Sequence, residues 1–74
     1  HHYYQIYDND KNIYENCNGY KETLEKIGYG TKSLVRHALD NNSKIQKGQY
    51  KGCRLRKITK GVTYELYKGV TYDK

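Results

Sequence analysis

Basic and polar side chains between positions 32 and 37 have the spacing and the chemistry for contacts with nucleic acid. Four residues stand at i, i+1, i+4 and i+5, a spacing that places them on one face of an α-helix: Lys32, Ser33, Arg36 and His37. Lysine and arginine can hydrogen-bond to guanine edges in the major groove of DNA, and serine can contact bases or phosphates. We therefore expect these four side chains to read base edges.

A second basic set follows this stretch. No acidic residue occurs between Asn41 and Tyr64, and seven cations there could hold flanking phosphates: Lys44, Lys47, Lys51, Arg54, Arg56, Lys57 and Lys60. Residues 41–74 contain nine Lys/Arg and two Asp/Glu, whereas residues 1–40 contain five and six. This asymmetry favours a polyanionic partner, although a solvated basic face would have the same composition.

The rest of the sequence does not form a recognisable catalytic or metal site. Residues 8–12, Asp-Asn-Asp-Lys-Asn, resemble the start of a calcium loop only superficially. That loop requires Gly at its sixth position and Glu at its twelfth, where this sequence has Ile13 and Gly19. His37 has no pattern of nucleophiles or carboxylates around it. We expect no enzymatic activity, no metal and no cofactor.

Cys17 and Cys53 are the only cysteines. They lack the CxxC spacing of zinc sites. Because the sequence shows no pattern of a secretory signal, a disulfide is the less favoured alternative. We expect two free thiols in or near the core of a cytoplasmic protein.

Two short helices must position the basic face. Residues 19–27 place Tyr20, Leu24 and Ile27 on one helical stripe. Gly28 can end this helix in a left-handed conformation, and residues 31–41 have the pattern of a second helix. Two helices around a tight glycine turn are typical of a helix-turn-helix, whose second helix can enter a major groove. A helical hairpin that only covers a sheet has the same pattern. We expect six apolar residues to be buried together: Leu24, Ile27, Leu34, Val35, Leu39 and Leu55.

Three strands are predicted beside the helices. Residues 3–17 alternate around a polar turn and predict a β-hairpin. Residues 50–58 predict a third strand, whose alternation turns Leu55 toward the core and Arg54 and Arg56 outward. The expected fold is therefore α+β, in the order ββααβ.

The chain of 74 residues is long enough for one small domain with a thin core, which we place at residues 3–60. Residues 1–2 look like the remnant of a purification tag. Residues 61–74 predict a C-terminal β-hairpin, in which residues 64–67 echo residues 4–7. The tail could therefore begin a second copy of the module, and an unrelated hairpin is the alternative. No apolar run has the length of a membrane span.

Three segments carry a resemblance to a known family: YQIYDNDKNIYENC, GYKETLEKIGYGTKSLVRHAL and KGQYKGCRLRKI, which together cover about residues 3 to 58. In this order they resemble the small modular DNA-binding repeats attached to homing endonucleases. The resemblance implies DNA binding through the helix-turn-helix, as an accessory to a nuclease or as a free-standing phage or bacterial protein. The sequence departs from the family in its longer acidic hairpin turn and shows no nuclease domain.

Double-stranded DNA is the partner that these patterns favour, and no membrane partner is expected. The alternative is a protein-interaction module, such as a phage-encoded inhibitor of a host protein, because the ten tyrosines would suit an interface. RNA binding through strand tyrosines is a third interpretation, since aromatic rings can stack on unpaired bases.

Overall fold

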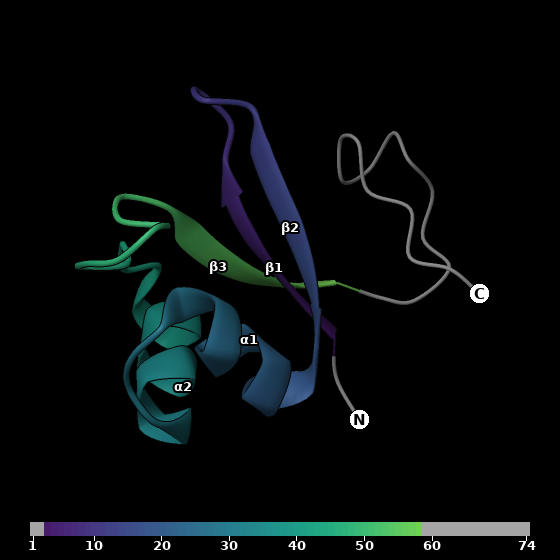
Figure 1. Ribbon diagram of the computed structural model, residues 1–74, viewed down its shortest axis with the longest axis vertical. Helices are drawn as coiled ribbons and strands as arrows, with labels where there is room; N and C mark the ends of the chain where they lie inside the picture. Colours follow the sequence, from purple (N-terminus) through teal and green to yellow (C-terminus); the bar gives the residue numbers. More distant parts are fainter. Residues whose placement is uncertain (1–2, 59–74) are drawn as a thin grey trace.

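The computed structural model describes residues 3–58, which form an α+β domain in the predicted order ββααβ (Figure 1). Its elements are β1 (Tyr3–Asp8), β2 (Ile13–Asn18), α1 (Gly19–Ile27), α2 (Lys32–Asn41) and β3 (Arg54–Ile58). No helix in this part of the chain is long and apolar enough to cross a membrane. The predicted hairpin at 61–74 and the candidate phosphate contact Lys60 lie outside the described residues.

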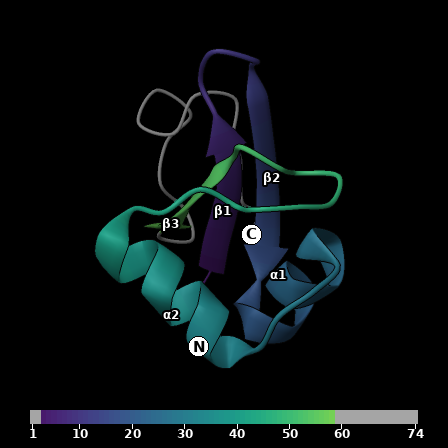
Figure 2. The same ribbon diagram turned by 90° about the vertical axis from the view of Figure 1, so that its left-hand side faces the viewer.

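The three strands form one antiparallel sheet in the order β2-β1-β3. In the central strand, Ile6 is opposite Glu15 of β2 and Leu55 of β3. Because side chains alternate along a strand, Tyr4 and Ile6 share the face that the helices cover. α1 packs against β1 and β2, whereas α2 packs against β3 (Figure 2). This arrangement brings the second helix beside the basic third strand.

The core lies between the sheet and the helices, and its buried members are Tyr4, Ile6, Cys17, Ile27, Val35, Ala38, Ile45, Cys53 and Leu55. Burial of Ile27, Val35 and Leu55 confirms that part of the prediction. Leu24, Leu34 and Leu39 are predicted to be buried with them, but they are only half-buried and pack at the margin of the core. In a two-layer domain of this size, the centre of each short helix reaches the sheet and the flanks of its apolar stripe meet solvent.

The third strand begins later than the alternation of residues 50–58 predicts. Residues 50–53 form a turn, in which the Cys53 amide donates to the Tyr50 carbonyl at 3.0 Å, and β3 starts at Arg54. The preceding loop also crosses to the end of α1. A Cβ atom on Gly48 would lie 2.8 Å from the Ile27 carbonyl oxygen, and the residue has φ +90°, so only glycine fits there.

Both cysteines are buried free thiols, as the sequence predicts. Desolvation by burial raises the pKa of Cys17 to about 11, and the Thr23 hydroxyl and Lys26 oppose this effect. The thiolate is the reactive form. At pH 8 we therefore expect Cys17 in the folded protein to be alkylated about 100-fold more slowly than in urea, from ionisation alone. Its rate should keep rising with pH up to about 11.

Mass spectrometry after timed alkylation would measure this rate. The control is the unfolded, unreduced protein, which should take two labels per chain. Recovery of no label there would show a disulfide, and equal labelling rates in folded and unfolded protein would contradict the burial of Cys17.

Candidate nucleic-acid interface

The second helix presents the predicted basic face to solvent. Val35 and Ala38 are buried and attach α2 to the core, because residues three apart lie on the same side of a helix. The exposed residues of α2 include the four candidate base readers: Lys32, Ser33, Arg36 and His37. Asn41 holds His37 in place, with its Nδ2 atom 3.1 Å from His37 Nδ1. The helix therefore packs through one side and leaves the other available to a partner.

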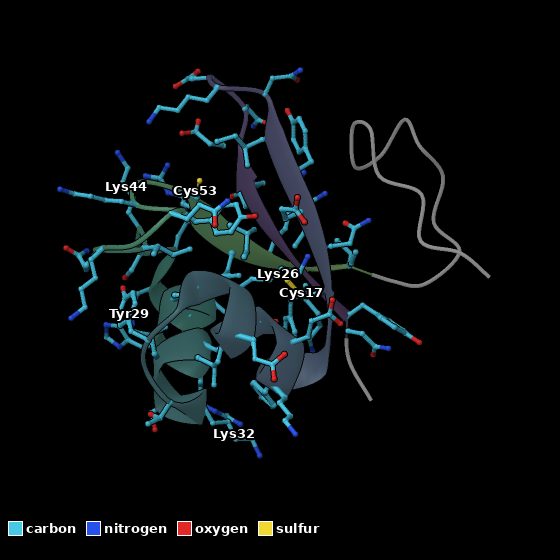
Figure 3. The ribbon with its side chains drawn as sticks, in the orientation of Figure 1. Cys17, Lys26, Tyr29, Lys32, Lys44 and Cys53 are labelled. Atoms are coloured by element: carbon cyan, nitrogen blue, oxygen red, sulfur yellow. The ribbon has the colours of Figure 1, made fainter. Side chains whose placement is uncertain are left out.

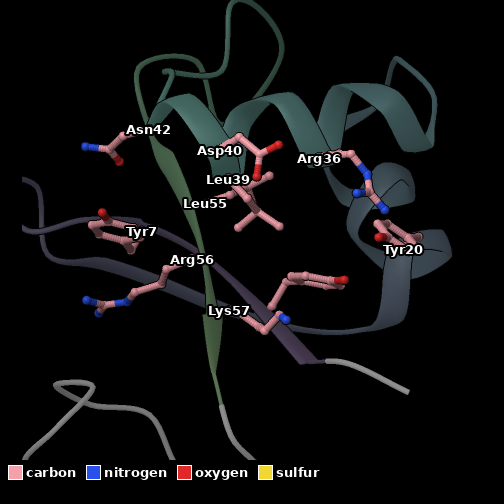
Figure 4. Close-up of a pocket in the computed structure, with 10 residues that line it drawn as sticks. Tyr7, Tyr20, Arg36, Leu39, Asp40, Asn42, Leu55, Arg56 and Lys57 are labelled. Atoms are coloured by element: carbon pink, nitrogen blue, oxygen red, sulfur yellow. The ribbon is translucent and has the colours of Figure 1, made fainter.

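The side chains of Lys32 and Arg36 both lie close to the Tyr20 ring, at the start of α1. The Nζ atom of Lys32 lies 4.9 Å from the centroid of the Tyr20 ring. Arg36 lies beside Tyr20 at one end of the same surface hollow (Figure 4), and after the contact with Tyr4 its positive charge also lowers the pKa of Tyr20. Tyr20 therefore anchors the two cations that stand one turn apart on α2.

Tyr20 is itself held by Tyr4, a residue of the central strand that is only 1% exposed. The two ring centroids are 5.4 Å apart. Burial and the hydrogen bond with Tyr20 raise the pKa of Tyr4 to about 12, whereas the hydrogen bond with Tyr4 is the main cause of the lowered pKa of Tyr20. Tyr4 therefore stays protonated and donates, and the Tyr20 oxygen accepts from Tyr4.

A groove of about 500 Å³ runs between α2 and β3 (Figure 4). Leu39 and Leu55 form its apolar floor. Figure 4 shows cations along the whole groove: Arg36 beside Tyr20 at one end, Arg56 beside Tyr7 at the other, and Lys57 between the two ends. The structure thus combines helix and strand cations around one concave surface.

The cations of β3 are divided between the two faces of the sheet. Lys57 is opposite Tyr4 and faces the helices, whereas Arg56 is opposite Gln5 on the other face. The Arg56 guanidinium is already engaged, since its Nε donates to Gln5 Oε1 at 2.7 Å and its Cζ lies 4.2 Å from the Tyr7 ring centroid. Both arginines of β3 point away from the core as predicted, and both are half-buried.

Arg54 is the other half-buried cation of β3. Its Nε donates to the Asn42 carbonyl at 3.3 Å, just after the end of α2. Arg54 therefore links the strand to the helix terminus, and this contact limits its freedom to hold a phosphate.

Of the three loop lysines, Lys44 alone adjoins the exposed face of α2, because it lines a hollow together with His37. Lys44 follows the helix, near His37, and Figure 3 shows it well apart from Lys32. The Nζ atom of Lys47 lies 5.1 Å from the Tyr29 ring centroid, at the end of α1. Lys51 is exposed in the turn before Cys53, on the loop that crosses in front of β1 and β2 in Figure 2.

The expected single set of phosphate contacts is therefore divided. Sequence spacing could not reveal this division, because Gly48 and the turn at residues 50–53 carry the loop away from α2.

The charges are also separated between two parts of the domain. Residues 28–58 contain eight Lys/Arg and one acidic residue, Asp40, whereas residues 3–27 contain three Lys/Arg and five Asp/Glu. Lys26 in the acidic part is paired with Glu15 at 2.9 Å. Since the cations gather on α2, β3 and their connection, a polyanion would meet this side of the domain first.

Tyr4 and Tyr20 adjoin the candidate interface and are not among the site residues predicted from the sequence. Tyr20 has the spacing of a core residue and Tyr4 the alternation of a strand residue. Their pairing depends on how α1 sits on β1, and no local pattern encodes that contact. In the described residues, no group of three or more His, Cys, Asp or Glu side chains could hold a metal ion.

Comparison with known proteins found no matching family model, no similar curated protein and no similar solved structure. The features of this domain that bear on function are therefore the geometry and charge of its α2 and β3 side.

Proposed function

We propose that the protein is a non-enzymatic double-stranded DNA-binding module, in which the exposed face of α2 enters the major groove. The observation that carries this proposal is the packing of α2. Val35 and Ala38 fix one side of the helix on the domain, and its opposite side is basic, polar and exposed. A major groove about 12 Å wide accepts an α-helix of this kind.

The positions around α2 suggest separate roles for its side chains. Ser33 and His37 are each two residues from Val35, about 200° around the helix, and so lie opposite the buried side. We assign these two residues to base edges. Lys32 and Arg36 lie on the flank of α2 toward Tyr20, and with Lys57 of β3 they are placed to hold phosphates of one strand.

Two further considerations support DNA binding. The order ββααβ with a basic second helix is the arrangement that the resemblance to the modular DNA-binding repeats implies. Among residues 3–58, several of the tyrosines that would suit a protein interface are engaged within the domain. Tyr7 stacks with Arg56, Tyr14 Oη donates to Asn9 Oδ1 at 2.7 Å, and Tyr29 Oη accepts from the Gln46 amide at 2.9 Å. We therefore place DNA binding ahead of protein interaction.

A salt-series titration with random duplex DNA tests the proposal. With Lys32, Arg36 and Lys57 as phosphate contacts, the logarithm of the binding constant should fall against the logarithm of salt concentration with a slope of about −3. Single-stranded RNA serves as the comparison and should bind more weakly. Absence of duplex binding even at low salt would reject DNA binding and favour the protein-interaction module.

A further inference from the structure

Some features of the groove between α2 and β3 are not needed for binding a regular DNA duplex. A phosphate on the surface of a duplex needs cations, but it does not need the apolar floor of Leu39 and Leu55. The groove volume of about 500 Å³ lies within the range of small-molecule sites, about 300–1,000 Å³. We propose that this groove is a mononucleotide site, which takes a phosphate at one end and the attached nucleoside over its floor. The site does not depend on the duplex binding proposed above.

The phosphate end combines residues from the helices with a neighbouring strand cation. Arg36 of α2 and Tyr20 of α1 line this end of the groove, and Lys57 of β3 lies between it and Arg56 (Figure 4). Lys32 adds a further positive charge above the Tyr20 ring. A phosphate monoester carries a charge of about −1.5 to −2 at pH 7, which this set of cations complements. The guanidinium also offers paired N–H groups to phosphate oxygens.

This end of the groove is preorganised by a buried residue. Tyr4 lies in the central strand opposite Cys17 on one side and Lys57 on the other. Because Tyr4 is fixed there and its ring centroid lies 5.4 Å from that of Tyr20, it sets the position of Tyr20, which lies beside Arg36 (Figure 4). A site whose side chains are already ordered loses less conformational entropy when a ligand binds.

The other part of the groove suits a nucleoside. Leu39, which is half-buried, offers apolar contact to a sugar or a base above the nearly buried Leu55. The Tyr7 ring closes the far end, where Arg56 holds it. Asp40 lines the rim and is the only acidic residue between positions 28 and 58. A carboxylate repels phosphates, but it can accept a hydrogen bond from the amino group of a base. The groove therefore separates an anion-binding end from a part that fits an aromatic, amino-bearing ring.

Calorimetric titration of the protein with cytidine 5′-monophosphate, cytidine and inorganic phosphate tests the proposal. The nucleotide should bind at least tenfold more tightly than either of its parts, because only the nucleotide fills both ends of the groove. Lys57→Ala and Tyr20→Phe should each weaken nucleotide binding by threefold or more. The matched control is Lys21→Ala, which removes an equal charge from the exposed side of α1 and should leave nucleotide binding unchanged.

Three outcomes would overturn the mononucleotide site. They are no nucleotide binding, inorganic phosphate binding as tightly as the nucleotide, and equal effects of Lys57→Ala and Lys21→Ala in proteins that circular dichroism shows to be folded. The duplex titration separates this proposal from the previous one. Duplex binding without nucleotide binding would reject only the mononucleotide site, and nucleotide binding without duplex binding would reject only the DNA-binding module.

Discussion

Replacing both Arg36 and Lys57 by alanine should weaken duplex DNA binding roughly 30- to 1,000-fold. Each side chain is exposed, so we allow about 1–2 kcal/mol for each charge-assisted phosphate contact after solvent screening. Loss of two phosphate contacts should also reduce the salt slope by about two. Because phosphates carry no sequence information, the loss should be similar for all duplexes. Salt-series titrations of the variant and the unmutated protein would measure both quantities.

The matched control removes the same charge from the acidic part of the domain. Lys11 lies in the turn between β1 and β2, and Lys21 lies on α1; both are exposed. Lys11→Ala combined with Lys21→Ala should leave the salt slope unchanged, because neither residue adjoins the groove or the exposed face of α2. Equal losses in the two double variants would show that net charge alone drives binding. A loss confined to one DNA sequence would instead assign Arg36 to a base edge.

Replacing Ile6 by alanine should lower the free energy of unfolding by about 2–5 kcal/mol, the usual cost of such a truncation in a packed core. Ile6 has no exposed surface, lies in the central strand and belongs to the core between the sheet and the helices. A typical domain has only about 5–15 kcal/mol of stability, so this loss is a large fraction of the total. Urea titration monitored by circular dichroism would measure the change.

Ile13→Ala is the comparison for Ile6→Ala, because Ile13 is half-buried in the neighbouring strand β2. It should lose less than about 2 kcal/mol, since less apolar surface leaves solvent there on folding. If Ile6→Ala does not fold, Ile6→Val should still fold and lose about 0.5–1.5 kcal/mol. Equal losses at Ile6 and Ile13 would contradict a core centred on the middle strand.

The sequence by itself determined the order of the elements. The alternation in residues 3–17 gives a hairpin, and the spacing of Leu24 and Ile27 gives a first helix whose observed bounds, Gly19–Ile27, agree with the prediction. The left-handed Gly28 ends that helix as expected, with its amide donating to the Leu24 carbonyl at 2.8 Å. These features are local, because hydrogen bonds within a helix, tight turns and side-chain periodicity all involve residues close in sequence.

Local patterns were less informative where the chain bends. The alternation of residues 50–58 predicts a strand that starts four residues too early, because the turn at Tyr50–Cys53 has the same run of basic and apolar residues as a strand. The exposure of Lys32, Ser33, Arg36 and His37 was predictable, since it follows from the apolar positions of the same helix.

Only the tertiary structure decided which of the basic side chains lie close to one another. The sheet order β2-β1-β3 puts Lys57 beside α2 and Arg36, whereas the crossing of the loop at Gly48 takes Lys47 to the far end of α1. The Tyr4–Tyr20 pair exists because α1 packs on the central strand, and the groove exists because α2 packs on the edge strand. These contacts join residues distant in sequence, so they depend on how whole elements pack and not on the spacing of residues within one element.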